Sequence, residues 1–414
     1  MDMPDMPPPP PAGAPPEDAY DAALSGRPSA LDGALGPYPM SREASGTAWQ
    51  PDLSQHGGLH GEAAGWMLMA HARLNLVYDR QAGPRGGEKA LLSGMAMGIA
   101  RRRVGRRGIL QLRAMVSPDP LMGARGYPLL LAAGESADGR TPLVDRQHPH
   151  DAFMELSASY SHHLGGKTGL FVYAGLPGEP SFGPPAFMHR LSIMDSPEAP
   201  ITHHWLDSSH IVFGVVTAGV IAGDVKLEAS RFNGREPDAH RWNIETGALD
   251  STAVRVSWNP ASTLSLQASW GRFVAPEQLA PHENQTRWSA SAIYTRLLSG
   301  GWWSSTLAWG RRSSDGRNLD AFALESAVRR GAWTLFARAE RIETDELTAA
   351  AGHHGPVYTA GKASLGLVRD VAITPHLALG AGGLAALNFV PRALRAAYGG
   401  RPTGLMAFIR LKVE

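Results

Sequence analysis

The sequence predicts an all-β fold, a single transmembrane antiparallel β-barrel of about 16 strands with long extracellular loops, one of them folded into the lumen. Three observations lead to this prediction. Segments of roughly 9 to 14 residues alternate between polar and apolar side chains, as barrel strands do. The number of these segments is even, and the connections between them alternate between tight and long. A barrel inserted in a membrane has each of these properties.

Alternation with a period of two is clearest over residues 251–258. One face of this segment carries Val254, Val256 and Trp258, and the other carries Ser251, Ala253, Arg255 and Ser257. An apolar face suits lipid, and a face of polar and small side chains suits a water-filled lumen. A soluble β-sandwich also alternates, but aromatic residues at segment ends, such as Trp258 and Trp288, favour the barrel.

Such segments follow one another along most of the chain. They lie near residues 64–80, 89–104, 108–117, 151–164, 167–176, 210–222, 224–233, 250–258, 262–274, 285–298, 301–312, 317–329, 332–344, 356–369, 375–390 and 402–414. The even count places both ends of the barrel on the same side of the membrane, which we expect to be the periplasmic side.

The connections between segments differ in length on the two sides. Those after even-numbered segments are tight, for example Gly165-Gly166 and Ser299-Gly300. Those after odd-numbered segments are longer, notably 118–150, 177–209 and 234–249. We therefore expect the long connections at the extracellular rim. Prolines stiffen 177–209, and this loop is expected to fold into the lumen and narrow it.

Composition sets the remaining bounds on the chain. Residues 1–48 are rich in Pro, Ala and Gly and are expected to form a disordered leader, with the barrel spanning 49–414. The first residues lack a charged and then apolar export signal, so any such signal is expected to lie upstream or to have been removed. A net charge of +1 argues against nucleic acid as a partner, and the absence of cysteine excludes disulfides and thiolate metal sites.

Histidines gather in the stretch 145–210. Eight of the 16 histidines lie there, at positions 148, 150, 162, 163, 189, 203, 204 and 210. In the run His148-Pro149-His150 the proline favours an extended backbone, which points both imidazoles the same way. Because 118–150 and 177–209 share one rim, their histidines can meet. The candidate ligands for a divalent ion, copper or zinc, are His148, His150, His189, His203, His204 and His210.

These residues predict an outer-membrane channel or transport protein, with divalent metal ions as the candidate solute and with a constriction lined by histidine and aspartate. The expected constriction residues are Asp145, Arg146, His148, His150, Asp151, His189, Arg190 and Asp207. The expected partners are the lipid bilayer with its lipopolysaccharide, and small ions or solutes. The sequence leaves the oligomeric state open.

Two alternatives remain. An outer-membrane hydrolase could use Asp207, Ser208, Ser209 and His210, although the sequence contains neither a G-x-S-x-G nor an H-E-x-x-H motif. A structural barrel could instead use the same histidines, aspartates and arginines as a hydrogen-bonded network that locks the loops together.

Five motifs also carry a resemblance. They are DRQHPHD at 145–151, GEPSFGPPAFMHR at 178–190, PEAP at 197–200, HHWLD at 203–207 and FNGREP at 232–237. With these motifs the chain resembles a family of poorly characterised outer-membrane proteins of Gram-negative bacteria, often associated with copper and other heavy-metal resistance. The resemblance implies a barrel and an outer-membrane location, and it assigns no activity and no site residue.

Overall fold

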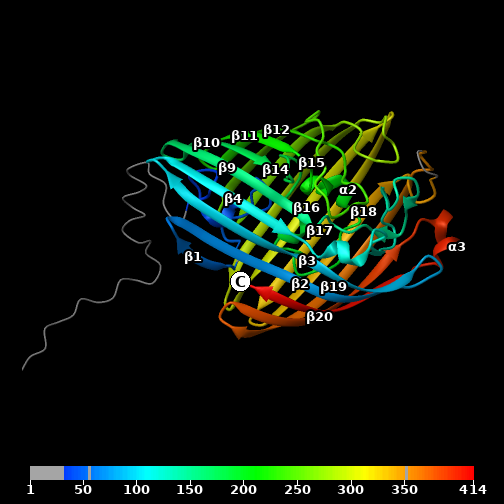
Figure 1. The fold of residues 1–414 in the computed structure, drawn as a ribbon. Coiled ribbons are helices and arrows are strands. Elements are labelled where there is room, and N and C mark those ends of the chain that lie inside the picture. The colour runs from blue at the N-terminus through cyan, green and yellow to red at the C-terminus, as the bar shows by residue number, and fades with distance from the viewer. Residues whose placement is uncertain (1–31, 55–56, 350–352) are drawn as a thin grey trace, which may run out of the picture.

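In the computed structural model, which describes residues 32–54, 57–349 and 353–414, 16 antiparallel strands form a closed barrel (Figure 1). The barrel strands are β2 (Trp66–Gln81), β3 (Gly87–Val104), β4 (Gly108–Val116), β9 (Phe153–Gly165), β10 (Thr168–Gly175), β11 (Val215–Ala222), β12 (Val225–Phe232), β13 (Ser251–Ala261), β14 (Leu264–Phe273), β15 (Gln285–Leu298), β16 (Gly301–Ser314), β17 (Arg317–Arg330), β18 (Trp333–Thr344), β19 (Tyr358–Thr374), β20 (Leu377–Phe389) and β21 (Thr403–Val413). Each of the 16 predicted segments overlaps one of these strands, which confirms the predicted fold class.

Pairing between the first and last barrel strands closes the sheet. The register of β2 against β21 runs from Ala72 opposite Val413 to Gln81 opposite Gly404. The first residues of β2 extend beyond this pairing and instead pair with the short strand β1 (Leu59–Ala63). In that pairing Ala63 lies opposite Trp66. All other barrel neighbours are consecutive in the chain, so their connections alternate between the two rims.

The two faces of each strand lie as the alternation predicts. In β13, Val256 and Trp258 are exposed on the outside, while Ser251, Ala253 and Arg255 are buried inside. Leucines and valines are exposed in the same way around the outer surface. A closed barrel with an apolar outer surface is stable in lipid, whereas exposing that surface to water is unfavourable. The chain is therefore an outer-membrane protein. No helix among the described residues is long and apolar enough to cross a membrane.

The two rims differ largely as expected, with one exception. The connections 117–152, 176–214 and 233–250 are long and lie on one rim. On the same rim, however, β16 and β17 are joined by only Asp315 and Gly316. Both residues have positive φ, 46° and 73°, which is the geometry of a tight hairpin turn. An Asp-Gly pair therefore produced a short connection where the alternation predicted a longer one.

The long connections contain the short elements of the structure. These are η2 (Asp119–Met122), β5 (Tyr127–Pro128), β6 (Glu135–Ser136), β7 (Pro142–Leu143), β8 (Arg146–Gln147), η3 (Phe187–His189), α2 (His203–Leu206), η4 (Ser208–His210), η5 (Arg392–Leu394) and α3 (Arg395–Tyr398), while η1 (Met40–Arg42) precedes the barrel. Figure 1 shows α2 among the inward-folded segments, in front of the strands of the far wall.

The connection 176–214, which we call the lumen loop, crosses the interior of the barrel. Its Arg190 binds Glu325 of β17 at 2.7 Å. Its Glu198 binds Lys362 of β19 at 2.7 Å, and Trp205 Nε1 donates a hydrogen bond to the Leu319 carbonyl. All three loop side chains are buried. The predicted folding of one long loop into the lumen is confirmed.

Part of the predicted leader is folded. Residues 1–31 lie outside the described residues, but 32–48, which composition predicted to be disordered, pack inside the barrel near the short-turn rim. Tyr38 packs with Trp49 and with Phe171 on the wall. Thr47 accepts hydrogen bonds from Lys226 and Arg255, two buried cations of the wall. The wall therefore adds partners to the segment's own hydrogen bonds, such as that from Tyr38 to Glu43.

Removing one buried charge should loosen the lumen loop. We expect Glu325→Gln to lower the free energy of unfolding by about 3–5 kcal/mol, because Arg190 is left buried without one of its two carboxylates. Folded and unfolded barrels migrate differently on gels, so the fraction unfolded at increasing temperature or urea concentration measures the free energy of unfolding. The exposed pair Arg341–Glu343 is the control, and Arg341→Gln should cost less than about 1 kcal/mol. Equal effects of the two variants would contradict the anchoring role of Glu325.

Candidate functional site

Five of the six candidate histidines meet at the rim that carries the long loops. The connection 117–152 supplies His148 and His150, and the lumen loop supplies His203 and His204 from α2 and His210 from η4. Ring centroids are 6.2 Å apart for His148 and His203, and 5.2 Å apart for His150 and His210 and for His203 and His210. The predicted meeting of the two histidine clusters therefore occurs in the structure.

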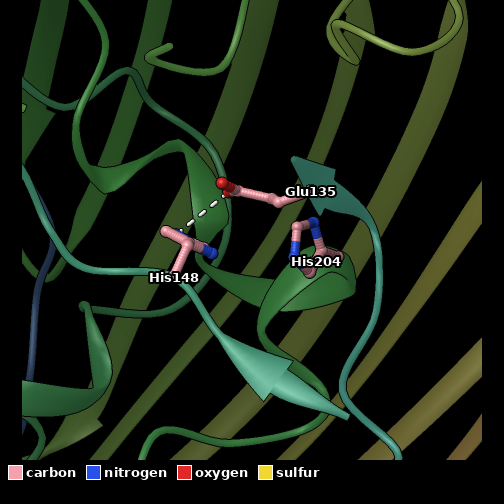
Figure 2. A group of neighbouring side chains, drawn as sticks. All are labelled: Glu135, His148 and His204. Carbon is pink, nitrogen blue, oxygen red and sulfur yellow. Dashed lines mark ion pairs between the residues drawn. The ribbon is translucent and has the colours of Figure 1, made fainter. Parts of the chain in front are cut away.

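Within this cluster, Glu135, His148 and His204 form the tightest group. One potential ligand atom from each lies within 4.8 Å of the others. Glu135 lies on β6, and its carboxylate reaches His148 Nε2 at 3.0 Å. Figure 2 shows the His204 ring beside Glu135, with His148 on the other side of the carboxylate. Two imidazoles and one carboxylate from separate segments thus converge on one buried point.

The protonation states in this group differ from residue to residue. Burial lowers the pKa of His148 to about 4 despite the nearby Glu135, so this imidazole is neutral at pH 7 and donates a hydrogen bond to the carboxylate. Burial also acts against the charge on His204, but Glu236 and then Glu135 raise the pKa of His204 to about 9. Glu236 lies 3.4 Å from His204 Nδ1. At neutral pH the group therefore holds one charged and one neutral imidazole.

The surrounding histidines are held by other partners. Asp119 binds His150 Nδ1 at 2.7 Å, and Asp207 binds His203 Nδ1 at 2.8 Å. Burial, together with the neighbouring His150 and His203, holds the pKa of His210 well below its usual value. Burial likewise lowers the pKa of His203, so His203 and His210 are neutral at pH 7, which is the state in which imidazole binds a metal.

The predicted constriction residues mostly fasten the loops. Asp145 pairs with Arg85 at 2.6 Å. Asp151 pairs with Arg241 at 3.1 Å. Arg190 joins Asp207 to Glu325. Arg146 donates a hydrogen bond to the Arg125 carbonyl. Of the three aspartates expected to support the histidines, Asp207 is the one hydrogen-bonded to a cluster imidazole, His203.

His189 lies apart from the rim cluster. It ends η3, and its ring centroid is 6.4 Å from that of His71 on β2. Phe187, at the start of the same short helix, packs against His150 of the cluster. One turn of chain thus separates a residue that contacts the cluster from one that faces the barrel wall.

Sequence reasoning missed the carboxylates that contact the candidate ligands. Glu135 and Glu236 lie 13 or more positions from His148 and His204 in the sequence, so spacing along the chain does not pair them. The available signal was the length of the connections 118–150 and 234–249. Both lie on the rim where the histidines meet, so their carboxylates were candidates for contact with the histidines.

The alternative hydrolase site is not assembled in this arrangement. Ser208 Oγ accepts a hydrogen bond from Arg287 at 3.0 Å, and His210 Nδ1 is hydrogen-bonded to the Asp207 carbonyl at 2.6 Å. Within the described part of the chain, no hydrogen bond joins His210 to the hydroxyl of Ser208 or Ser209. A serine nucleophile activated by histidine needs that contact.

The charge on His204 can be tested directly. Because Glu236 stabilises the imidazolium, we expect one histidine to remain protonated up to about pH 9, and Glu236→Gln to lower its pKa. Carbon-13 NMR of histidine-labelled protein in detergent micelles measures the titration, and His204→Asn assigns it. A spectrum in which every histidine titrates below pH 7 would rule out this electrostatic description.

Comparisons with known proteins agree with the barrel fold. Neither a protein-family model nor a curated protein matches the sequence. Among solved structures, OmpF of Salmonella typhi in complex with daunomycin matches with a TM-score of 0.54 at 8% identity, covering 86% of this chain and 100% of that one. An anion-selective porin from Comamonas acidovorans has a TM-score of 0.48 at 13% identity, covering 84% of this chain and 99% of its own. The likeness to OmpF supports a porin-like barrel fold.

Proposed function

We propose that this barrel is an outer-membrane channel for small ions that binds a divalent metal ion, copper or zinc, between its rim loops. The observation that carries the proposal is the convergence of Glu135, His148 and His204 within 4.8 Å. Two imidazole nitrogens and one carboxylate oxygen form a donor set suited to Zn²⁺ or Cu²⁺. The earlier resemblance to barrels associated with heavy-metal resistance points to the same class of solute.

The electrostatics of the group suit transient binding. His148 is already neutral, and Glu135 offers one carboxylate oxygen, while its other oxygen binds Arg241 at 3.0 Å. His204 must first lose a proton held with a pKa of about 9, which at pH 7 weakens metal binding roughly 100-fold. A site along a permeation path must bind an ion and also release it, so a weakened site fits a channel better than a storage site.

A structural role for the surrounding ion pairs is compatible with this function. The buried pairs of Asp145 with Arg85, Asp151 with Arg241, and Asp207 with Arg190 hold the two loops in place. This observation favours the loop-locking alternative for those aspartates. The histidines and Glu135 then supply the binding site, and the aspartates and arginines supply its rigidity.

Loss of two ligands should abolish metal binding. We expect the double variant His148→Ala and His204→Ala to lose Zn²⁺ and Cu²⁺ binding and to change the cation selectivity of the channel, measured by calorimetry and by conductance in a planar bilayer. His162, which lies exposed on β9 away from the cluster, provides the control variant His162→Ala. Unchanged stoichiometry and selectivity in the double variant would refute the metal site.

Proton release should make the binding depend on pH. Because His204 must be neutral to bind, the apparent affinity should rise about tenfold per pH unit from pH 7 to 9 and level off above the pKa. Calorimetry in two buffers with different ionisation enthalpies counts the released protons. In Glu236→Gln the rise should shift to lower pH. An affinity that is constant over this range would show that His204 is not a ligand.

A further inference from the structure

A second group of potential ligands lines a cavity of about 810 Å³ at the short-turn side of the lumen loop. Its wall includes the inner faces of β2, β3 and β4, and the lumen loop and the segment 32–54 bound it on other sides. Six of the chain's 14 methionines line it: Met40, Met67, Met69, Met95, Met97 and Met194. His71 and His189 line it as well.

The strand register brings these side chains together. Met67, Met69 and His71 occupy alternate positions of β2, so all three point into the barrel. His71 lies directly opposite Met97 of β3, and Met97 lies directly opposite Met115 of β4. Opposite residues of antiparallel strands have Cα atoms about 4.5–5.5 Å apart and share one face, so the imidazole and the thioethers are neighbours.

His189 reaches the same group from the lumen loop. Its ring centroid lies 6.4 Å from that of His71, with the two rings nearly perpendicular. The Nδ1 atom of His71 is buried and forms no hydrogen bond with any described residue. A buried imidazole nitrogen without a hydrogen bond is costly unless another group, such as a metal ion, occupies the position in front of it.

We propose that this cavity binds a soft monovalent metal ion, Cu(I) or Ag(I), through the imidazoles of His71 and His189 and the thioether sulfurs of Met97, Met69 and Met95. Thioether is a soft, uncharged ligand that selects Cu(I) over Zn²⁺. The site is separate from the rim group of Glu135, His148 and His204 and does not rest on it.

Charges around the cavity are paired with one another. Of the cations that line it, Arg113 binds Glu155 at 2.8 Å, and Lys412 binds Glu414. Of the carboxylates, Asp195 binds Arg410. No carboxylate belongs to the proposed ligand set, unlike the set at the rim.

Packing is the competing explanation for these methionines. Met95, Met97, Met115 and Met154 form a buried cluster with Ile211, and methionine commonly fills irregular interior space. Leucine has nearly the same volume and lacks the sulfur, so methionine-to-leucine variants keep the packing and remove the ligands.

The test uses the full chain in detergent with Ag(I), which is not reduced or oxidised under these conditions, as the probe. We expect stoichiometric Ag(I) binding, with sulfur and nitrogen neighbours in its X-ray absorption spectrum. The combined variant Met69→Leu, Met95→Leu and Met97→Leu should bind Ag(I) at least roughly tenfold more weakly, because loss of even one contact that supports a metal costs about this much affinity. The control is Met122→Leu with Met406→Leu, two buried methionines that do not line the cavity, and it should bind Ag(I) as the unmodified chain does.

Two outcomes would overturn the proposal: an Ag(I) spectrum without sulfur neighbours in the unmodified chain, or unchanged Ag(I) affinity in the triple leucine variant. The spectrum of the unmodified chain decides the matter even if the triple variant folds poorly. Zn²⁺ binding is measured on the same samples. Loss of Ag(I) binding with Zn²⁺ binding retained supports this site, and loss of Zn²⁺ binding in His148→Ala with His204→Ala reports on the rim site alone.

Discussion

The position of the lumen loop depends on the buried ion pairs between this loop and the wall of the barrel. Arg190 lies between Asp207 of its own loop and Glu325 of β17, and none of the three is exposed to solvent. Separating such charges inside a protein is expensive, so the loop has one stable position. Asp207 in turn orients His203 and ends α2, which carries His204. The geometry of the rim site therefore follows from the docking of Arg190 against a strand far away in the sequence.

Local patterns explain how much could be predicted from the sequence. Alternation along a strand is set by neighbours in the chain, so the inward position of Arg255 and the outward position of Val256 could be predicted without any structure. Partners far apart in the chain could not. Glu135 and Glu236 meet the histidines only after three loops fold over one rim, and Thr47 meets Lys226 of β12 and Arg255 of β13 only in the folded barrel. The segment 32–48 has few core residues, as its composition indicates, and two of them, Leu35 and Tyr38, are buried against Phe171 and Ile221 of the wall.

The lumen loop presents different chemistry on its two sides. Towards the rim it offers imidazoles beside carboxylates, which also lie near Arg241 and Arg287. Towards the short-turn side it offers His189 to a wall of thioethers and cations. The single turn η3 separates these surroundings. Phe187 at its start packs against His150 on the rim side, and His189 at its end faces His71 on the short-turn side. The loop thus acts as a partition between an oxygen- and nitrogen-rich compartment and a sulfur-rich one.

The folded segment 32–54 also constrains how the barrel is made. It lies within a wall whose seam, β2 against β21, is sealed by consecutive backbone pairs. A sealed cylinder admits a chain only through its ends, whereas an unsealed sheet can wrap around material already in place. The cations Lys226 and Arg255 give that segment a docking surface as soon as β12 and β13 pair, which the chain order allows before the last strand is added. The order of the strands therefore allows the wall to curl around a segment that is already docked on its concave side.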